Sequence, residues 1–207
     1  DPGPNEFEHF MKTLKTLESS QKILIDFSGT RPGLHYLRII QELWKNFRSR
    51  VFELVLNLSN PNLTDDDFLG LMATFFETEA GQKTNEQILS FDVNLSGCCL
   101  LQLGLGSLPQ YISKMPNLLK LIINLSQTNI NNQTVEALMK SGISSTKLLE
   151  LISLDFSFSS VNEEAINTLI KGLHPLIHQL KVIEINIRQV ESEVERMGYY
   201  SIEGLSI

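Results

Sequence analysis

The chain has 207 residues, of which 42% are hydrophobic and 20% are charged, so it is long enough to bury a sizeable core as a single domain over residues 1–207. Its formal net charge of −7 argues against nucleic acid as a partner, because binding to phosphates requires clustered Lys and Arg. No stretch reaches the roughly 18 consecutive apolar residues of a membrane helix, so we expect no membrane partner.

The cysteines and the N-terminus bear on the compartment. Cys98 and Cys99 are the only two cysteines, and as neighbours they cannot form a disulfide framework. No basic and apolar signal segment opens the sequence. We therefore expect an intracellular, cytoplasmic protein, and from the abrupt start at residues 1–4 we expect a fragment of a longer one.

One short motif recurs six times along the chain. It consists of an apolar residue, a variable residue, an apolar, a polar and another apolar residue, and Ser follows five of the six copies. The last apolar residue of each copy, here called the marker, recurs at steps of 31, 37, 30, 31 and 31 residues: Phe27, Leu58, Leu95, Leu125, Phe156 and Ile187. A period in this range predicts an array of strand–helix units.

The first predicted elements, in chain order, are an opening helix or truncated repeat within residues 1–20 and two strand–helix units. Apolar residues at helical spacing indicate each helix. The two units place strands at residues 23–27 and 54–58 and helices at 34–47 and 68–76. Thr64 and the acids after it predict the start of the second helix. A polar insertion at residues 77–86 explains the one long step and is expected to be a surface loop.

The third unit differs from the others. Its strand is expected at residues 91–95, but the segment from Leu105 to Pro109 interrupts the helical pattern and predicts only a short or 3₁₀ segment near Pro109. Asn131 and Asn162 predict the later helix starts. The remaining strands are expected at residues 121–125, 152–156 and 183–187, and the remaining helices at 135–139 and 165–173. Residues 191–207 are expected to form a C-terminal cap or a truncated repeat.

Each predicted strand has a polar residue at the same position, and we call these six residues the Asx row: Asp26, Asn57, Asn94, Asn124, Asp155 and Asn186. Eightfold barrels and doubly wound sheets cover both faces of their strands, which therefore read as continuous apolar runs. The Asx row instead favours one buried and one hydrated face. The pattern predicts a parallel sheet lining the inside of an arc, with helices outside.

The units also resemble a known family. In the second unit Leu56, Leu58 and Leu63 match the later leucines of the pattern L-x-x-L-x-L-x-x-N/C-x-L, and in the third unit Cys98 matches its N/C position. Thr or Ser occupies that position in three other units. This pattern resembles the ribonuclease-inhibitor-like leucine-rich repeats over about residues 21–190. The resemblance implies an α/β leucine-rich repeat solenoid of about six repeats, a horseshoe arc with a parallel concave sheet and outer helices.

The candidate partner-binding residues lie in two neighbouring exposed rows of this expected sheet. One is the Asx row, whose acid and amide groups can bind basic or polar groups of an extended partner. The other, which we call the middle row, comprises Leu24, Val55, Asp92, Ile122, Ser153 and Glu184. Its apolar members suit an anchoring surface. An alternative for the Asx row is purely structural, since Asn and Asp side chains can hydrogen-bond one another across stacked strands.

Other residues that invite a chemical role are better explained by structure. No motif contains a His that could activate the Ser after the marker. We therefore expect the hydroxyl of that Ser to bond local backbone and not to act as a nucleophile. His174 and His178 have helical ligand spacing but no Glu between them, and Pro175 is expected to bend or end their helix. Gly104 and Gly106 indicate a turn. We expect no catalytic residue, no metal, no cofactor and no small-molecule substrate.

These features together predict a non-catalytic scaffold that binds a partner protein through the concave sheet and the strand-end loops. One alternative is a regulatory subunit of the GTPase-activating type, because the family includes such a protein. The other is a structural component of a larger assembly, which would use apolar residues near the two ends of the chain: Phe7, Phe10, Tyr199, Tyr200 and Ile202.

Overall fold

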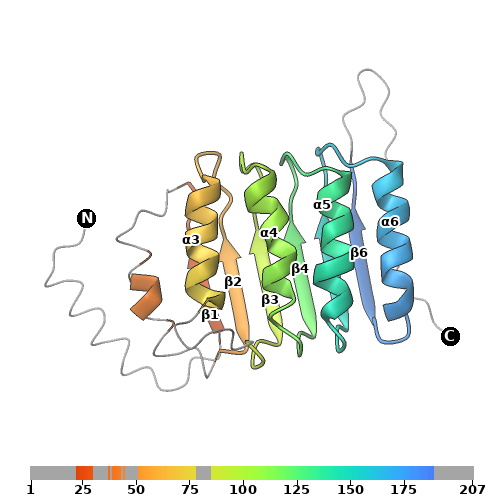
Figure 1. Cartoon of the computed structure of the whole chain (residues 1–207), viewed down its shortest axis with the longest axis horizontal. Coiled ribbons are helices and arrows are strands. Elements are labelled where there is room, and N and C mark those ends of the chain that lie inside the picture. Colours follow the sequence, from red (N-terminus) through yellow and green to blue (C-terminus); the bar gives the residue numbers. More distant parts are fainter. Residues whose placement is uncertain are drawn as a thin grey trace, which may run out of the picture.

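The computed structural model describes residues 22–29, 37, 39–42, 44, 51–77 and 85–188. Within these ranges six parallel strands form one sheet, in which each strand lies beside its neighbours in the sequence (Figure 1). The strands are β1 (Lys22–Asp26), β2 (Glu53–Asn57), β3 (Ser90–Asn94), β4 (Lys120–Asn124), β5 (Leu151–Asp155) and β6 (Val182–Asn186). All six predicted strands are confirmed, each beginning one residue earlier than expected.

The strands align in strict register. Asn57 is the partner of Asp26 on one side and of Asn94 on the other, and the Asx row continues in this way to Asn186. The backbone pairing extends one residue past β1 to β5; for example, the N–H of Leu58 donates to the Asn94 carbonyl oxygen at 2.8 Å. Equivalent residues of successive units therefore lie side by side across the sheet.

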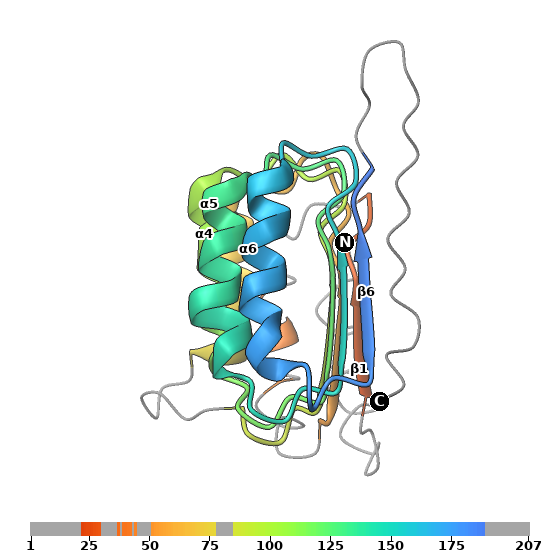
Figure 2. The same cartoon turned by 90° about the vertical axis from the view of Figure 1, so that its right-hand side faces the viewer.

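The helices lie on one face of this sheet, each between two consecutive strands along the chain. Figure 2 shows α4, α5 and α6 as one layer beside the sheet. A short segment with described helical residues at 37, 39–42 and 44 lies between β1 and β2. The α-helices after it are α3 (Asp65–Phe76), α4 (Gln102–Ile112), α5 (Asn132–Ala137) and α6 (Glu163–Leu173). The structure is thus an α/β fold of two layers.

Three of these helices begin at the residues that the sequence predicts. Thr64 forms a capping box with Asp67, whose backbone N–H donates to the Thr64 hydroxyl oxygen at 3.2 Å. The side chains of Asn131 and Asn162 accept hydrogen bonds from backbone N–H groups in the first turns of α5 and α6. Helix α6 ends at Leu173, where a 3₁₀ turn (His174–Leu176) contains Pro175, as expected.

Helix α5 also changes geometry before it ends. It continues through a π-helical turn (Leu138–Gly142) into a 3₁₀ turn (Ile143–Ser145).

The described elements carry no helix with the length and apolar character that a membrane crossing requires.

The core fills the space between the sheet and the helices. Strand residues that point to the helices are almost completely buried in β2 to β5, for example Leu54, Phe91 and Leu121 at 0% exposure. An aromatic cluster adds to them, with Trp44 and Phe75 ring centroids 5.0 Å apart in an edge-to-face arrangement. The inward residues of the two end strands, such as Ile23 and Ile183, are only partly buried.

The prediction for the third unit was wrong, because α4 is an α-helix that includes Pro109 in its last turns. An interior Pro costs about 3 kcal/mol, through a lost hydrogen bond and a steric clash. Burial of Leu105, Leu108 and Ile112 on the same helix offsets that cost, at roughly 1.5–3 kcal/mol for each side chain. Pro109 also packs closely on Gly142, where an added Cβ would lie 3.1 Å from the Pro109 Cα.

The structure describes three residues of the polar insertion at residues 77–86, namely Glu77, Asn85 and Glu86. Glu77 and Glu86 are exposed, as expected for a surface loop. Asn85 is buried instead, and its amide donates to the Phe75 carbonyl oxygen at 3.3 Å, which ties the end of the insertion to α3. The opening helix within 1–20, the cap at 191–207 and the apolar residues proposed at the chain ends lie outside the described residues.

Candidate functional site

The candidate site is the face of the sheet opposite the helices, which we call the helix-free face. Because side chains alternate along a strand, three residues of each strand point to this face and two point to the core. The middle row and the Asx row contribute the twelve residues that the sequence analysis selected. The first residue of each strand also points to this face, and we call these six residues the first row: Lys22, Glu53, Ser90, Lys120, Leu151 and Val182. Helices of the described ranges leave this face uncovered (Figure 2).

The structure therefore brings all twelve selected residues onto one surface. Within the middle row Leu24 is 63% exposed and Glu184 is exposed, whereas Val55, Asp92, Ile122 and Ser153 are half-buried. Sequence reasoning did not select the first row, although it lies two residues before the middle row and shares the period of two that defines a strand face.

Four members of the Asx row close the turn after their own strand. The side-chain oxygen of Asp26 accepts the backbone N–H of Ser28 at 2.8 Å, and Asp155 accepts that of Ser157 at the same distance. Asn94 and Asn124 make the same bond to the Ser that follows each of them, at 3.0 Å. This Asx turn is a physical reason for Asp or Asn at this position.

Members of the Asx row also bond to each other across strands. The Asn94 amide donates to Asn57 Oδ1 at 3.1 Å, and the Asn186 amide donates to Asp155 Oδ2 at 3.2 Å. Hydrogen bonds from the Ser28 side chain, and secondarily from the Ser28 backbone N–H, lower the pKa of the exposed Asp26 carboxyl. Of the two interpretations left open by the sequence, these bonds support the structural one, and they leave the middle row as the stronger candidate for binding.

The hydroxyls after the markers do not behave as predicted. Ser126 donates to the Asn124 side chain at 2.7 Å and Ser96 to the Ser59 hydroxyl at 3.2 Å, so neither bonds local backbone. The backbone contact comes from the residue three positions after the marker. Thr128 donates to the Leu125 carbonyl oxygen at 2.6 Å, and the Cys98 thiol donates to that of Leu58 at 2.9 Å.

Asp92 is the half-buried charged residue of the middle row. Its strand neighbours are Val55 on β2 and Ile122 on β4. No hydrogen bond or ion pair to its carboxylate occurs among the described residues. Burial raises the pKa of the Asp92 carboxyl, and more distant attraction to Lys120 and Lys22 opposes that rise.

Acidic residues outnumber lysines on the helix-free face. Lys22 and Lys120 are its bases within the described strands, and Lys22 pairs with Glu53 at 3.4 Å. The acids of the face are Asp26, Glu53, Asp92, Asp155 and Glu184. Its middle and Asx rows contain acids but no base, which gives this part of the surface a negative potential.

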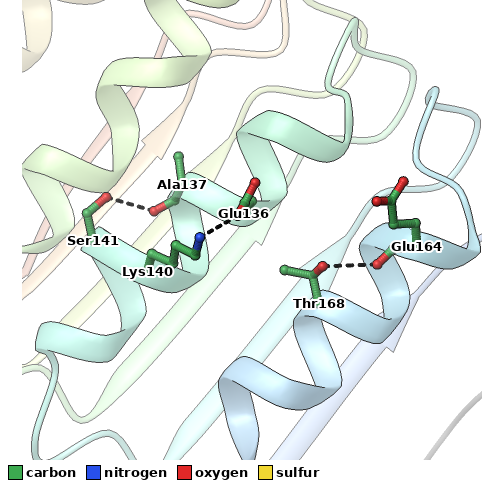
Figure 3. A network of polar contacts seen from close by, with 6 residues as sticks. All are labelled: Glu136, Ala137, Lys140, Ser141, Glu164 and Thr168. Atoms are coloured by element: carbon green, nitrogen blue, oxygen red, sulfur yellow. Dashed lines mark hydrogen bonds and ion pairs between the residues drawn. The ribbon is translucent and has the colours of Figure 1, made fainter.

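The outer surface of the helices has a different character. Figure 3 shows Lys140 paired with Glu136 one turn earlier in the chain, and Ser141 and Thr168 donating to carbonyl oxygens of their own helical segments. Such local pairs are ordinary on a solvent-facing helix. Ile170 on α6 is an exposed apolar residue outside the helix-free face, at 57% exposure.

The remaining sequence candidates have structural roles or lie apart. Gly104 and Gly106 are inside α4, so the turn interpretation was wrong. An added Cβ on Gly104 would lie 2.6 Å from Asp65 Oδ1, the oxygen that accepts the Leu101 N–H at 2.9 Å and so caps α4. His174 and His178 are exposed near the end of α6. Across the described ranges, no group of three His, Cys, Asp or Glu side chains could hold a metal ion.

The strand-end turns contain a feature that sequence reasoning missed. The residue two positions after the marker has a positive φ in four units, namely Gly29, Gly97, Gln127 and Phe158. In Phe158 the angle is +58° and the ring is 45% exposed. The glycines at the equivalent positions of two units were the signal that could have indicated this conformation.

No protein-family profile and no curated protein matches the sequence significantly. Among solved structures the chain is similar to leiomodin-1 actin-binding site 2, with a TM-score of 0.50 and 13% sequence identity. The similarity covers 86% of this chain and 92% of that one. At this identity the likeness concerns the fold alone.

Proposed function

We propose that this chain is a non-catalytic protein-binding module and that the helix-free face with its strand-end turns is the binding surface. The observation that carries the proposal is the middle row, where the exposed Leu24 and the half-buried Val55 and Ile122 lie on the side of the sheet that no described helix covers. Apolar side chains on such a surface suit contact with another protein.

The proposal includes a leucine-rich repeat solenoid as the finer description of the fold. Three observations support it: the nearly constant period, the strict register of the Asx row, and the side chains of Cys98 and Thr128 that donate to strand-end carbonyls. In solenoids of this kind each unit contacts its neighbours and the sheet forms a continuous binding surface.

The cysteines support a cytoplasmic location within the same proposal. Cys98 is buried and Cys99 is exposed, and both are free thiols. An exposed free thiol suits a reducing compartment. Burial raises the pKa of the Cys98 thiol, which disfavours the thiolate that a nucleophile needs.

Actin is the first protein to test as a partner, because the similar structure is described as an actin-binding site. Co-sedimentation of the purified chain with filamentous actin, and its binding to monomeric actin, would test this directly. Binding that Leu24→Arg abolishes would support actin as the partner. Absence of binding to either form would remove actin while leaving the proposed surface to be tested with other proteins.

The surface itself is tested by a matched pair of variants. Leu24→Arg places a charge on the helix-free face and Ile170→Arg places the same charge on α6, at residues of similar exposure. We expect Leu24→Arg to weaken binding to a purified partner at least about tenfold, because a charge replaces an exposed apolar contact. Ile170→Arg should bind like the wild type. Equal affinities for all three proteins, measured calorimetrically, would exclude the helix-free face.

A further inference from the structure

Asp92 bears on the chemistry of the partner. This half-buried carboxylate lies in the middle row, and the described residues provide it with neither a hydrogen bond nor an ion pair. A carboxylate that is partly withdrawn from water without a partner is unfavourable. A cation from outside the chain would compensate it.

The neighbours of Asp92 restrict the form of that cation. Val55 and Ile122 flank it on the adjacent strands, at a strand spacing of about 4.8 Å. Lys and Arg side chains combine a charged end with an aliphatic stem that packs on apolar surface. Asp92 can pair with the charged end of such a side chain, and Val55 and Ile122 on the adjacent strands can contact its aliphatic stem. A simple metal ion would make no apolar contact with these two flanking residues.

The rest of the middle and Asx rows also favours a positively charged ligand. The Asx row and the middle row contain Asp26, Asp155 and Glu184 in addition to Asp92, and no Lys or Arg. Lys120 is in the first row and attracts the Asp92 carboxylate without forming an ion pair with it. A segment with several positive charges is therefore electrostatically complementary to these rows, which favours its encounter and its orientation.

We propose that the helix-free face binds a basic segment of a partner protein and that Asp92, flanked by Val55 and Ile122, receives one Lys or Arg side chain of that segment. This inference rests on the proposed function. It adds the chemical class of the ligand and the residue that selects it.

A phage-displayed library of random linear peptides tests the inference without a known partner. Peptides selected on the wild-type chain should be enriched in Lys or Arg beside apolar residues. A selected peptide, synthesised and measured by calorimetry, should bind Asp92→Asn about tenfold more weakly. It should bind Glu136→Gln, a matched loss of one carboxylate on α5, with unchanged affinity. Replacing the selected Lys or Arg by Gln should remove the difference between wild type and Asp92→Asn.

The possible results separate this inference from the proposed function. The inference would be overturned if the selected peptides lose binding to Leu24→Arg but carry no excess of Lys or Arg. It would also be overturned if they lose binding to Leu24→Arg but bind Asp92→Asn as well as the wild type. Either result would leave the binding face in place. Peptides insensitive to Leu24→Arg, or no selected peptide at all, would count against both. A wild-type dimer that Leu24→Arg converts to a monomer in sedimentation would show a second copy as the occupant and would also overturn the inference.

Discussion

Asp92 connects the stability of the fold to its proposed role. Its pKa is raised by burial, so its charged form is less favourable in the folded chain than in the unfolded one. That destabilisation is present above the folded-state pKa and disappears as the pH falls below the ordinary value of 3.8. A residue that costs stability while remaining on an exposed face is typical of a binding surface.

Asp92→Asn is therefore expected to increase the free energy of unfolding at pH 7 while it weakens binding. The gain over the wild type should shrink as the pH is lowered towards 3.8, since the wild-type carboxyl then becomes protonated. Urea unfolding of both proteins at a series of pH values measures this difference. A variant that is less stable than the wild type at pH 7 would contradict the environment described for Asp92.

Substitution by Ala should change stability in opposite directions at two glycines, because their backbone conformations differ. Gly97 has φ +69° with no atom within 4 Å of an added Cβ, so Gly97→Ala should cost about 1 kcal/mol through the backbone alone. Gly106 is inside α4 and also has open space around an added Cβ, so Gly106→Ala should stabilise by roughly 0.5–1 kcal/mol. Thermal or urea unfolding of the pair checks both signs, and equal effects would be inconsistent with the left-handed turn.

At the scale of elements, helix α3 depends on Thr64, the N-cap residue that precedes it. Thr64→Ala removes the hydroxyl that accepts the Asp67 N–H, and the expected loss is about 1 kcal/mol of unfolding free energy. Thr168→Ala on α6 is the matched control, because the Thr168 hydroxyl only donates to the Glu164 carbonyl of its own helix. The control should be neutral or slightly stabilising. Similar losses in both variants would show that the cap contributes nothing specific.

The elements also show what could be predicted from the sequence. The six strands and three helix starts follow from local patterns, a polar residue at a fixed place in each motif and a capping residue before each helix. Helix α4 could not be predicted in this way, because its passage through Pro109 depends on burial against the sheet and on contact with Gly142. The burial of Asn85 likewise depends on α3, which lies earlier in the chain.

For the candidate site, the sequence could predict which residues share a surface but not the role of each one. A period of two identifies the residues that share a strand face, so the twelve selected residues do lie on one surface. Their individual roles depend on distances between strands. The Asn94 amide donates to Asn57, whereas Asp92 has no such partner among the described residues, and the local pattern does not indicate which side chain finds a partner on the next strand.

The molecule as a whole has two surfaces of different character. Its helical side carries local ion pairs such as that of Lys140 with Glu136, while its sheet side has apolar residues between acids. A two-layer fold leaves one sheet face without a covering layer, and the described helices all lie on the other (Figure 2). That asymmetry is the reason for assigning partner binding to the helix-free face.

Site-specific photo-crosslinking is the most direct measurement of where a partner lies. A photoreactive amino acid replaces Leu24 on the helix-free face in one protein and Ile170 on α6 in another, both highly exposed in the wild type. With a purified partner, we expect a crosslink from position 24 and none from position 170. A crosslink from position 170 with none from position 24 would place the partner on the helices and contradict binding through the sheet.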